Sequence, residues 1–97
     1  MDVYEFQGRI AATFGEKDSK RGIPGTFMYF VEEVGELSEA LREPEDHDLE
    51  GEFADCFAWL VSLAHIAGVD LAAVTAKKYG TDCPGCGESP CTCDTKP

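Results

Sequence analysis

Residues 27–41 read Phe-Met-Tyr-Phe-Val-Glu-Glu-Val-Gly-Glu-Leu-Ser-Glu-Ala-Leu, and the prediction of the fold starts from this segment. Its apolar residues recur at intervals of three and four, which is the spacing of one face of an α-helix. The apolar stripe consists of Phe27, Phe30, Val31, Val34, Leu37 and Leu41. The pattern predicts a helix over residues 25–42, and Pro44 marks its end.

Three further segments have the same periodicity of apolar residues. The four predicted helices cover residues 2–14, 25–42, 49–67 and 69–80. Between the first two, the glycines and basic residues from Gly15 to Thr26 predict a loop, and residues 43–48 predict a polar turn. Gly68 is expected to end the third helix. The sequence therefore predicts an all-α domain of about four helices over residues 1–80.

The third predicted helix is apolar on nearly every side from Phe53 onward. Its bulky residues include Phe57, Trp59 and Leu63. A helix without a polar face must be covered all round, and a chain of 97 residues with about four helices has little left to cover it. We therefore expect the chain to associate with copies of itself.

The charge balance is strongly acidic, with 19 acidic residues against eight basic ones and a formal net charge of −11. Proteins that bind nucleic acids usually carry a cluster of basic residues for the phosphates, and this acidic composition argues against one. The N-terminus has no cationic start and no apolar core of a signal peptide. Asp55 interrupts the longest weakly polar run, which is too short for a membrane helix of about 20 apolar residues. We expect a cytoplasmic protein that binds neither nucleic acid nor membrane.

Five acidic residues occur at helical spacings in the second and third predicted helices. Glu32, Glu33 and Glu36 form an acidic edge beside the apolar stripe, because residues three or four apart are neighbours on a helix. Glu52 and Asp55 are likewise neighbours on one face of the third helix. Like charges at this spacing destabilise an isolated helix slightly, so these positions call for an explanation beyond local structure.

Asp55 is the hardest of the five to explain. Its neighbours along the chain are Ala54, Cys56 and Phe57, so we expect it to be buried. A buried carboxylate without a partner is costly or becomes protonated. Asp55 should therefore pair with a cationic side chain or bind a hard metal cation together with the glutamates of the facing helix.

The metal alternative accounts for both helices at once. Two antiparallel helices joined by a short turn would bring Glu33 and Glu36 opposite Glu52 and Asp55. Four carboxylates without a histidine form an all-oxygen site, which suits Mg²⁺ or Mn²⁺ rather than zinc. That much negative charge would hold more than one ion or present the metal to an anionic ligand such as a phosphate.

The same residues resemble the signature of the MazG-like nucleotide pyrophosphohydrolases, which is EExxE followed by ExxD. Here it reads Glu32-Glu33-Val-Gly-Glu36 and Glu52-Phe-Ala-Asp55, and the phrase from Gly25 to Leu41 is also similar to that family. The resemblance extends from about Phe6 to Tyr79. It implies an all-α helical bundle that pairs as a homodimer or a dimer of dimers.

The resemblance also implies an activity, which is Mg²⁺- or Mn²⁺-dependent hydrolysis of a nucleoside or deoxynucleoside triphosphate to the monophosphate and pyrophosphate. By the same resemblance, Glu33, Glu36, Glu52 and Asp55 hold the metal. Glu32 matches the position that completes the metal site or orients the attacking water. All five residues are therefore expected to be catalytic.

Basic residues should neutralise the phosphates of such a substrate. The candidates are Lys20 and Arg21 in the predicted loop and Lys77 or Lys78 on the last helix, and Tyr29 is a further candidate for the substrate pocket. Members of the family often continue with a Lys…Asn…Arg pattern that helps to bind substrate, and here the Asn and Arg are missing. Substrate preference is therefore open.

Four of the five cysteines, Cys83, Cys86, Cys91 and Cys93, lie in the tail formed by residues 81–97. Cys83-Pro-Gly-Cys86-Gly resembles one knuckle of a zinc ribbon, and four sulfurs could close one tetrahedral structural zinc site. Disulfide bonds are the alternative. Without a secretion signal, clustered cysteines favour a metal. Cys56, alone on the third helix, is expected to be a core residue.

Two other functions remain open at this stage. A phosphoribosyl-ATP pyrophosphohydrolase would share the fold, and a substrate profile would distinguish it. A non-catalytic module that senses metal and nucleotide, and whose zinc knuckle binds a protein, would bind nucleotide without releasing pyrophosphate.

Overall fold

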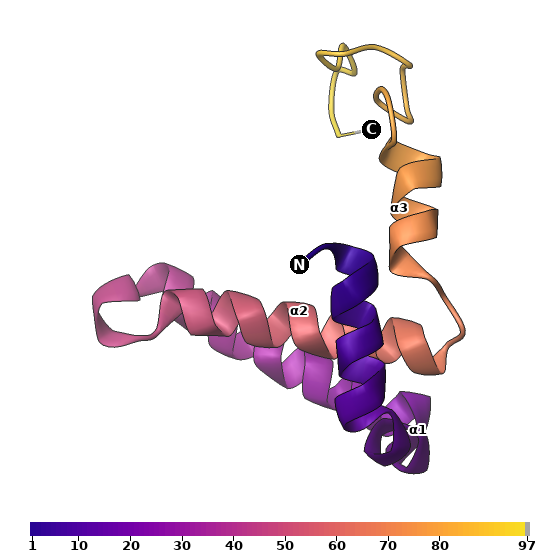
Figure 1. Cartoon of the computed structure of the whole chain (residues 1–97). Helices are drawn as coiled ribbons and strands as arrows, with labels where there is room; N and C mark the ends of the chain where they lie inside the picture. Colours follow the sequence, from indigo (N-terminus) through magenta and orange to yellow (C-terminus); the bar gives the residue numbers. More distant parts are fainter. Residues whose placement is uncertain (97) are drawn as a thin grey trace.

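The computed structural model describes residues 1–96, which form three α-helices and one short 3₁₀ turn (Figure 1). Helix α1 spans Val3–Arg42, the turn η1 spans Pro44–Asp46, α2 spans Leu49–Ile66 and α3 spans Leu71–Tyr79. No strand occurs within these residues, so the all-α prediction is confirmed. The number of helices is three rather than about four, because the first two predicted helices are one bent helix.

The bend in α1 lies at Gly22, whose backbone angles of φ 83° and ψ 171° are not helical. This conformation is essentially restricted to glycine. Pro24 follows at once, in the first turn of the second half of the helix, where a proline needs no amide hydrogen-bond partner. In Figure 1 the two halves of α1 run in different directions on either side of this point.

The predicted loop from Gly15 to Thr26 is therefore wrong, since the helix continues to Arg21. Gly15 did not break the helix because it is a packing residue. A β-carbon on Gly15 would lie 3.3 Å from Nε2 of His65, so the glycine lets α1 pass close to α2. The basic residues in this segment occupy helical positions, with the Nζ of Lys20 3.9 Å from a carboxylate oxygen of Glu16 one turn away.

The other helix boundaries follow from capping residues. Asp48 and Asp70 precede α2 and α3, and their side chains accept hydrogen bonds from the backbone amides of Gly51 (3.1 Å) and Ala73 (3.2 Å). Gly68 has a φ of 75° and terminates the turn after α2. The predicted polar turn and the two later helices are therefore confirmed within a residue or two.

The core lies where α1 and α2 run side by side in opposite directions (Figure 1). The buried apolar residues within residues 1–96 are few and mostly small: Ile10, Ala40, Val61 and Ala64. Helix α3 projects away from this pair. The side chain of Gln7 anchors its start, because it donates to the carbonyl of Val69 (2.7 Å) and accepts from the amide of Leu71 (2.9 Å).

Within residues 1–96, no single helix is both long enough and apolar enough to cross a membrane. Only α2 and α3 together reach the required length and apolar composition, and the two are bent by 101° relative to each other.

Replacing Gly22 with alanine tests whether the bend requires glycine. We expect G22A to lower the free energy of unfolding by about 1–3 kcal/mol, because alanine is strained at these backbone angles. The nearest atom to an added β-carbon there is 3.9 Å away, so the effect would be conformational rather than steric.

Gly8 provides the matched control, because it lies in the regular part of α1 with no atom near an added β-carbon. G8A should stabilise the protein by about 0.5–1 kcal/mol. Urea denaturation followed by circular dichroism measures both variants, and equal effects of the two substitutions would contradict the assigned bend.

Candidate active site

The second half of α1 and the first half of α2 bring three glutamates together. Glu33 and Glu36 come from α1, and Glu52 comes from α2. Each offers a carboxylate oxygen, and these three oxygens all lie within 4.8 Å of one another. The predicted meeting of the two acidic edges therefore occurs, and it results from the antiparallel pairing of the helices.

No cationic side chain in the part of the chain that the structure describes pairs with this acidic cluster. Neither ion pair found within residues 1–96 involves a member of the cluster. Oε2 of Glu33 and Oε2 of Glu52 are buried and have no hydrogen-bond partner among the described residues. Buried polar atoms are normally satisfied, and each exception costs about 1–3 kcal/mol.

The crowding raises the pKa of two of these carboxyl groups. Burial, followed by the neighbouring Glu36 and the charges of Asp55 and Glu52, raises the pKa of Glu33 from 4.5 to about 7. The pKa of Glu52 is also raised, first by burial and then by the charges of Glu36 and Asp55. The same charges and its own burial raise the pKa of the nearby Cys56 thiol.

Asp55 is exposed, so the expectation that it is buried is wrong. The reason is that neighbours along a helix point in different directions, so apolar neighbours in the sequence do not cover this carboxylate. Phe53 and Phe57, two positions away, lie on nearly the opposite side of α2 and are themselves 52% and 41% exposed. Asp55 lies three residues after Glu52, on the same side of the helix. It is near enough to raise the pKa of Glu33 and Glu52, although it is not one of the three residues whose oxygens meet within 4.8 Å.

The donor set of the cluster fits a hard divalent cation. All its ligand atoms are carboxylate oxygens, which Mg²⁺ and Mn²⁺ prefer, and no histidine or cysteine belongs to it. A cation would supply partners for the two buried Oε2 atoms and remove the repulsion between the carboxylates. Glu33, Glu36 and Glu52 would hold it, and Asp55 lies beside them as a fourth donor.

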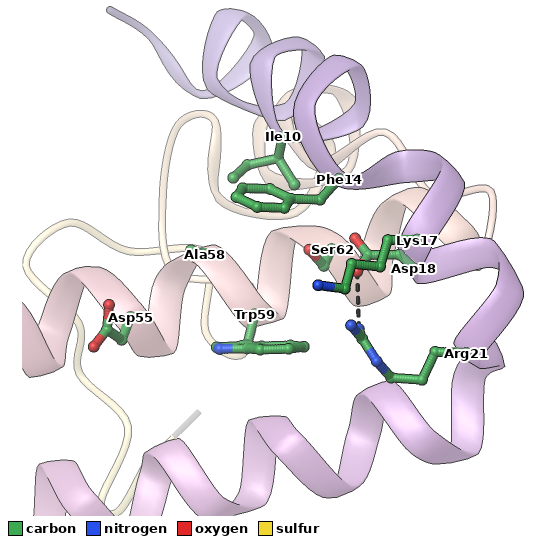
Figure 2. Close-up of a pocket in the computed structure, with 9 residues that line it drawn as sticks. All are labelled: Ile10, Phe14, Lys17, Asp18, Arg21, Asp55, Ala58, Trp59 and Ser62. Atoms are coloured by element: carbon green, nitrogen blue, oxygen red, sulfur yellow. Dashed lines mark hydrogen bonds and ion pairs between the residues drawn. The ribbon is translucent and has the colours of Figure 1, made fainter.

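A cavity of about 250 Å³ adjoins Asp55 (Figure 2). The first half of α1 forms one wall and α2 forms the other, so the cavity depends on the bend at Gly22. Asp55 lies at one end and Ser62 lies two turns further along α2, with Trp59 between them. The lining residues are Ile10, Phe14, Lys17, Asp18, Arg21, Asp55, Ala58, Trp59 and Ser62.

Arg21 and Asp18 form an ion pair at the end of the cavity away from Asp55. The Nη1 of Arg21 donates to Oδ1 of Asp18 at 2.9 Å, and the guanidinium carbon lies 5.0 Å from the centre of the Trp59 ring. Asp18 is only 2% exposed, and its Oδ2 has no hydrogen-bond partner within residues 1–96. The cavity therefore combines an aromatic surface with a buried carboxylate.

The remaining predicted substrate residues are dispersed. Tyr29 does not line the cavity, but it stacks on the cavity residue Trp59, with ring centroids 5.1 Å apart. Glu32 is exposed and lines a different surface hollow, which includes Gly25 and Met28. Three exposed lysines lie outside the acidic cluster and the cavity: Lys20, Lys77 and Lys78.

Sequence reasoning missed Asp18, Phe14 and Ser62 as cavity residues. The signal for Asp18 was present, because Asp18 and Arg21 are three residues apart, which is the spacing of an ion pair along a helix. It was overlooked because this segment was assigned to a loop.

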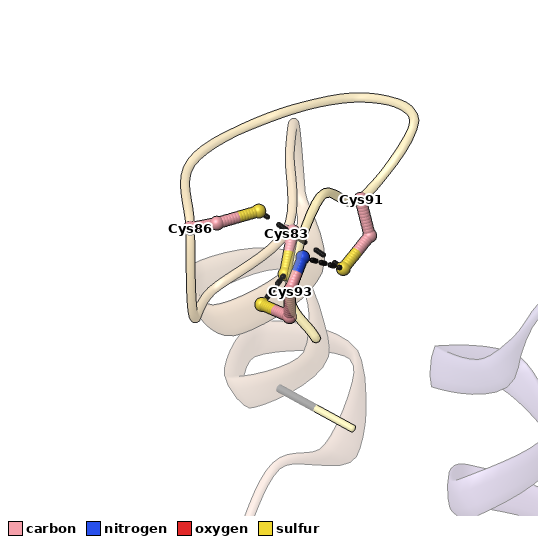
Figure 3. A group of neighbouring side chains, drawn as sticks. All are labelled: Cys83, Cys86, Cys91 and Cys93. Atoms are coloured by element: carbon pink, nitrogen blue, oxygen red, sulfur yellow. Dashed lines mark hydrogen bonds between the residues drawn. The ribbon is translucent and has the colours of Figure 1, made fainter. Parts of the chain in front are cut away.

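The sulfur atoms of Cys83, Cys86, Cys91 and Cys93 form a second cluster, in which all four lie within 4.8 Å of one another (Figure 3). This cluster lies in the tail beyond α3 and is compatible with a bound metal ion. No disulfide joins these cysteines.

Comparison with known protein families identifies the chain. The sequence model of the MazG nucleotide pyrophosphohydrolase domain matches residues 24–86. The match contains both acidic motifs and ends inside the cysteine tail, while the resemblance was expected to begin at Phe6 and to end at Tyr79. A search of curated proteins finds no match. Because the family model covers well over half of the 97 residues, the chain belongs to the family of MazG nucleotide pyrophosphohydrolase domains.

Proposed function

We propose that the protein hydrolyses the α–β phosphoanhydride bond of a nucleoside or deoxynucleoside triphosphate, releasing the monophosphate and pyrophosphate. The observation that carries this proposal is the acidic cluster of Glu33, Glu36 and Glu52, which needs a hard cation to be stable. Membership of the pyrophosphohydrolase family indicates the type of reaction, which is hydrolysis of a nucleotide with release of pyrophosphate. The proposed cofactor is Mg²⁺, with Mn²⁺ as a substitute.

In this proposal, bound Mg²⁺ neutralises charge on the phosphates and makes the attacking water more acidic. The three glutamates would hold the cation, and the raised pKa values of Glu33 and Glu52 reflect the lack of positive charge around these two carboxylates. Asp55 lies between the cluster and the cavity, where an exposed carboxylate can orient the water or accept its proton. Glu32 remains the alternative for this role, although its side chain lines a different part of the surface.

The cavity beside Asp55 is the proposed site of the nucleoside. Ser62 follows Asp55 by seven positions of helix, which corresponds to a distance of about 10 Å along the cavity. A nucleotide whose phosphates lie at Asp55 would therefore extend along α2 and place its base near Trp59. An aromatic ring provides a stacking surface for a base. Oδ2 of Asp18 is an unsatisfied acceptor suited to an N–H group of a base, and Lys17 adds positive charge at the cavity wall.

Two other functions can be distinguished from this one by assays of substrate and product. A phosphoribosyl-ATP pyrophosphohydrolase would accept only the phosphoribosylated nucleotide in a substrate panel. A non-catalytic module for sensing metal and nucleotide would bind nucleotides without releasing pyrophosphate at any Mg²⁺ or Mn²⁺ concentration. We favour hydrolysis because an open cavity adjoins the carboxylates, so that substrate and cation can meet there.

We also propose that the functional form is a homodimer or a dimer of dimers. Large apolar side chains remain uncovered on the outer sides of both long helices. On α1, Phe27 is 52% and Val31 is 50% exposed, and on α2, Phe53 is 52% and Leu60 is 41% exposed. Phe27 and Val31 are four residues apart and therefore neighbours on α1, and exposed apolar groups of this kind often mark an interface. A second copy would cover it with the same surface, as in most symmetric dimers.

Removing one carboxylate from the proposed cation site tests the reaction. We expect E36Q and D55N to lower the rate of pyrophosphate release by a factor of about 100 or more, because each removes charge that binds the cation or directs the water. A coupled pyrophosphate assay over a panel of nucleoside triphosphates measures the rate. Circular dichroism should show an unchanged helix content.

Glu39 offers the control, because it is an exposed glutamate on α1 outside the acidic cluster. E39Q should retain the activity of the unmodified protein. Pyrophosphate release that survives in E36Q and D55N would refute the site, and its absence from the unmodified protein with every nucleotide would refute the reaction.

The raised pKa of Glu33 predicts how stability depends on pH in protein freed of metal by a chelator. Between about pH 4.5 and 7 the folded state holds a proton on Glu33 that the unfolded state has lost, so stability falls as pH rises through this range. The melting temperature should therefore be lower at pH 8 than at pH 5.5. Mg²⁺ should raise it at pH 8, because a ligand of the folded state stabilises that state.

The variant E33Q isolates this contribution from the general effect of a net charge of −11. E33Q should show a smaller decline in melting temperature between the two pH values, while E39Q should follow the unmodified protein. Identical declines in all three proteins would contradict the assignment.

Self-association can be tested by sedimentation at micromolar concentration. The unmodified protein should sediment as a dimer or tetramer, and V31K should shift it toward the monomer by placing a charge in the proposed interface. V74K is the matched control, because Val74 is 43% exposed but lies on α3. A monomeric unmodified protein, or an equal effect of both substitutions, would contradict the proposed interface.

A further inference from the structure

The tail after α3 cannot be held together by an apolar core. Residues 81–96 contain no large apolar side chain, and almost all of them are exposed. Cys83, Cys86 and Cys93 are the only residues of this segment that are partly buried. The sulfur cluster therefore forms the centre of the tail, and a segment of this composition needs a crosslink to have a defined structure.

The distances between the sulfurs match the geometry of one tetrahedral metal site. The Sγ atoms of Cys83 and Cys93 are 3.8 Å apart, and those of Cys86 and Cys91 are 4.0 Å apart. Four thiolates at a zinc–sulfur distance of about 2.3 Å form a tetrahedron whose edges are about 3.8 Å. Two sulfurs of a disulfide would instead be about 2.05 Å apart.

The backbone around the cluster is arranged to donate hydrogen bonds to the sulfurs. The amides of Gly85, Thr92 and Cys93 lie 3.3 Å from the Sγ atoms of Cys83, Cys86 and Cys91, respectively. Such hydrogen bonds favour the charged thiolate over the neutral thiol.

The turn after the first pair of cysteines brings the second pair within reach. The amide of Gly87 donates to the carbonyl of Cys83 at 2.8 Å, and the amide of Cys83 donates to the carbonyl of Glu88 at 3.1 Å. Gly87 has a φ of 75°, which a residue with a side chain rarely adopts. The chain therefore reverses between the two cysteine pairs.

We propose that the four tail cysteines bind one zinc ion as thiolates in a closed, structural site. Thiolate ligands in a tetrahedral arrangement select zinc over the hard cations that suit the acidic cluster. Four protein ligands leave no position for water or substrate, so the ion orders the tail and takes no part in hydrolysis. The tail lies at the far end of α3, away from the α1–α2 pair (Figure 1).

Elemental analysis of the full chain purified with a thiol reductant tests this site directly. The expected result is one zinc per chain that survives dialysis. Replacing it with Co²⁺ should produce the absorption bands of a tetrahedral cobalt–thiolate site, which carboxylate ligands do not give. Iron in place of zinc, two disulfides, or five free thiols without metal would each overturn the proposal.

Cysteine variants locate the ion and separate this site from the catalytic proposal. C86S and C91S should lose zinc, and the tail should become sensitive to protease while circular dichroism of the helices is unchanged. C56A is the matched control, since Cys56 lies on α2, and it should retain zinc. Zinc that remains bound in C86S and C91S would overturn the assignment. The metal content does not depend on hydrolysis, so a failure of either proposal is recognised separately.

Discussion

Mutual repulsion between carboxylates opposes the packing of the two long antiparallel helices. Glu33, Glu36 and Glu52 hold oxygens within 4.8 Å of one another, and no lysine or arginine of residues 1–96 pairs with them. Helix packing brings these charges together, so the apolar contacts between α1 and α2 must offset an unfavourable electrostatic free energy. A protein selected only for stability would replace these residues. The proposed cation would account for their presence, since a bound ion would convert a destabilising cluster into a crosslink between the helices.

The bend at Gly22 connects this cluster to a place for substrate. If α1 were straight, its first half would continue beyond the end of α2 and would form no second wall for the cavity. The bend brings Ile10 and Phe14 over α2, and Gly15 allows the close approach against His65. The cavity that results ends at Asp55, beside the cluster. One glycine conformation thus determines the shape of the site, although Gly22 itself touches neither the cluster nor the cavity.

The sequence predicted the acidic cluster because the spacing of Glu33 and Glu36 is regular and a short turn forces the next helix to run antiparallel. It predicted the wrong boundary near Gly15, because glycine can break a helix or permit close packing, and local sequence does not distinguish the two. It also predicted the wrong burial for Asp55, because neighbours along a helix point in different directions. The cavity residue Asp18 was missed because the same boundary error placed it in a loop, where its helical spacing from Arg21 had no meaning. Tertiary packing, rather than propensity, decided each of these positions.

The exposed apolar surface and the acidic cluster belong to the same two helices, and this has a consequence for the cation site. Repulsion between the carboxylates tends to separate α1 from α2, and the buried apolar core between them is small. In the proposed dimer, residues such as Val31 and Phe53 would be covered by a second copy, which would hold both helices from outside. Burial of apolar area contributes about 25 cal/mol per Å², so even a modest interface offsets several kcal/mol of repulsion. Association would then keep the carboxylates at the spacing that a divalent cation requires, and binding of the cation would in turn favour the associated form.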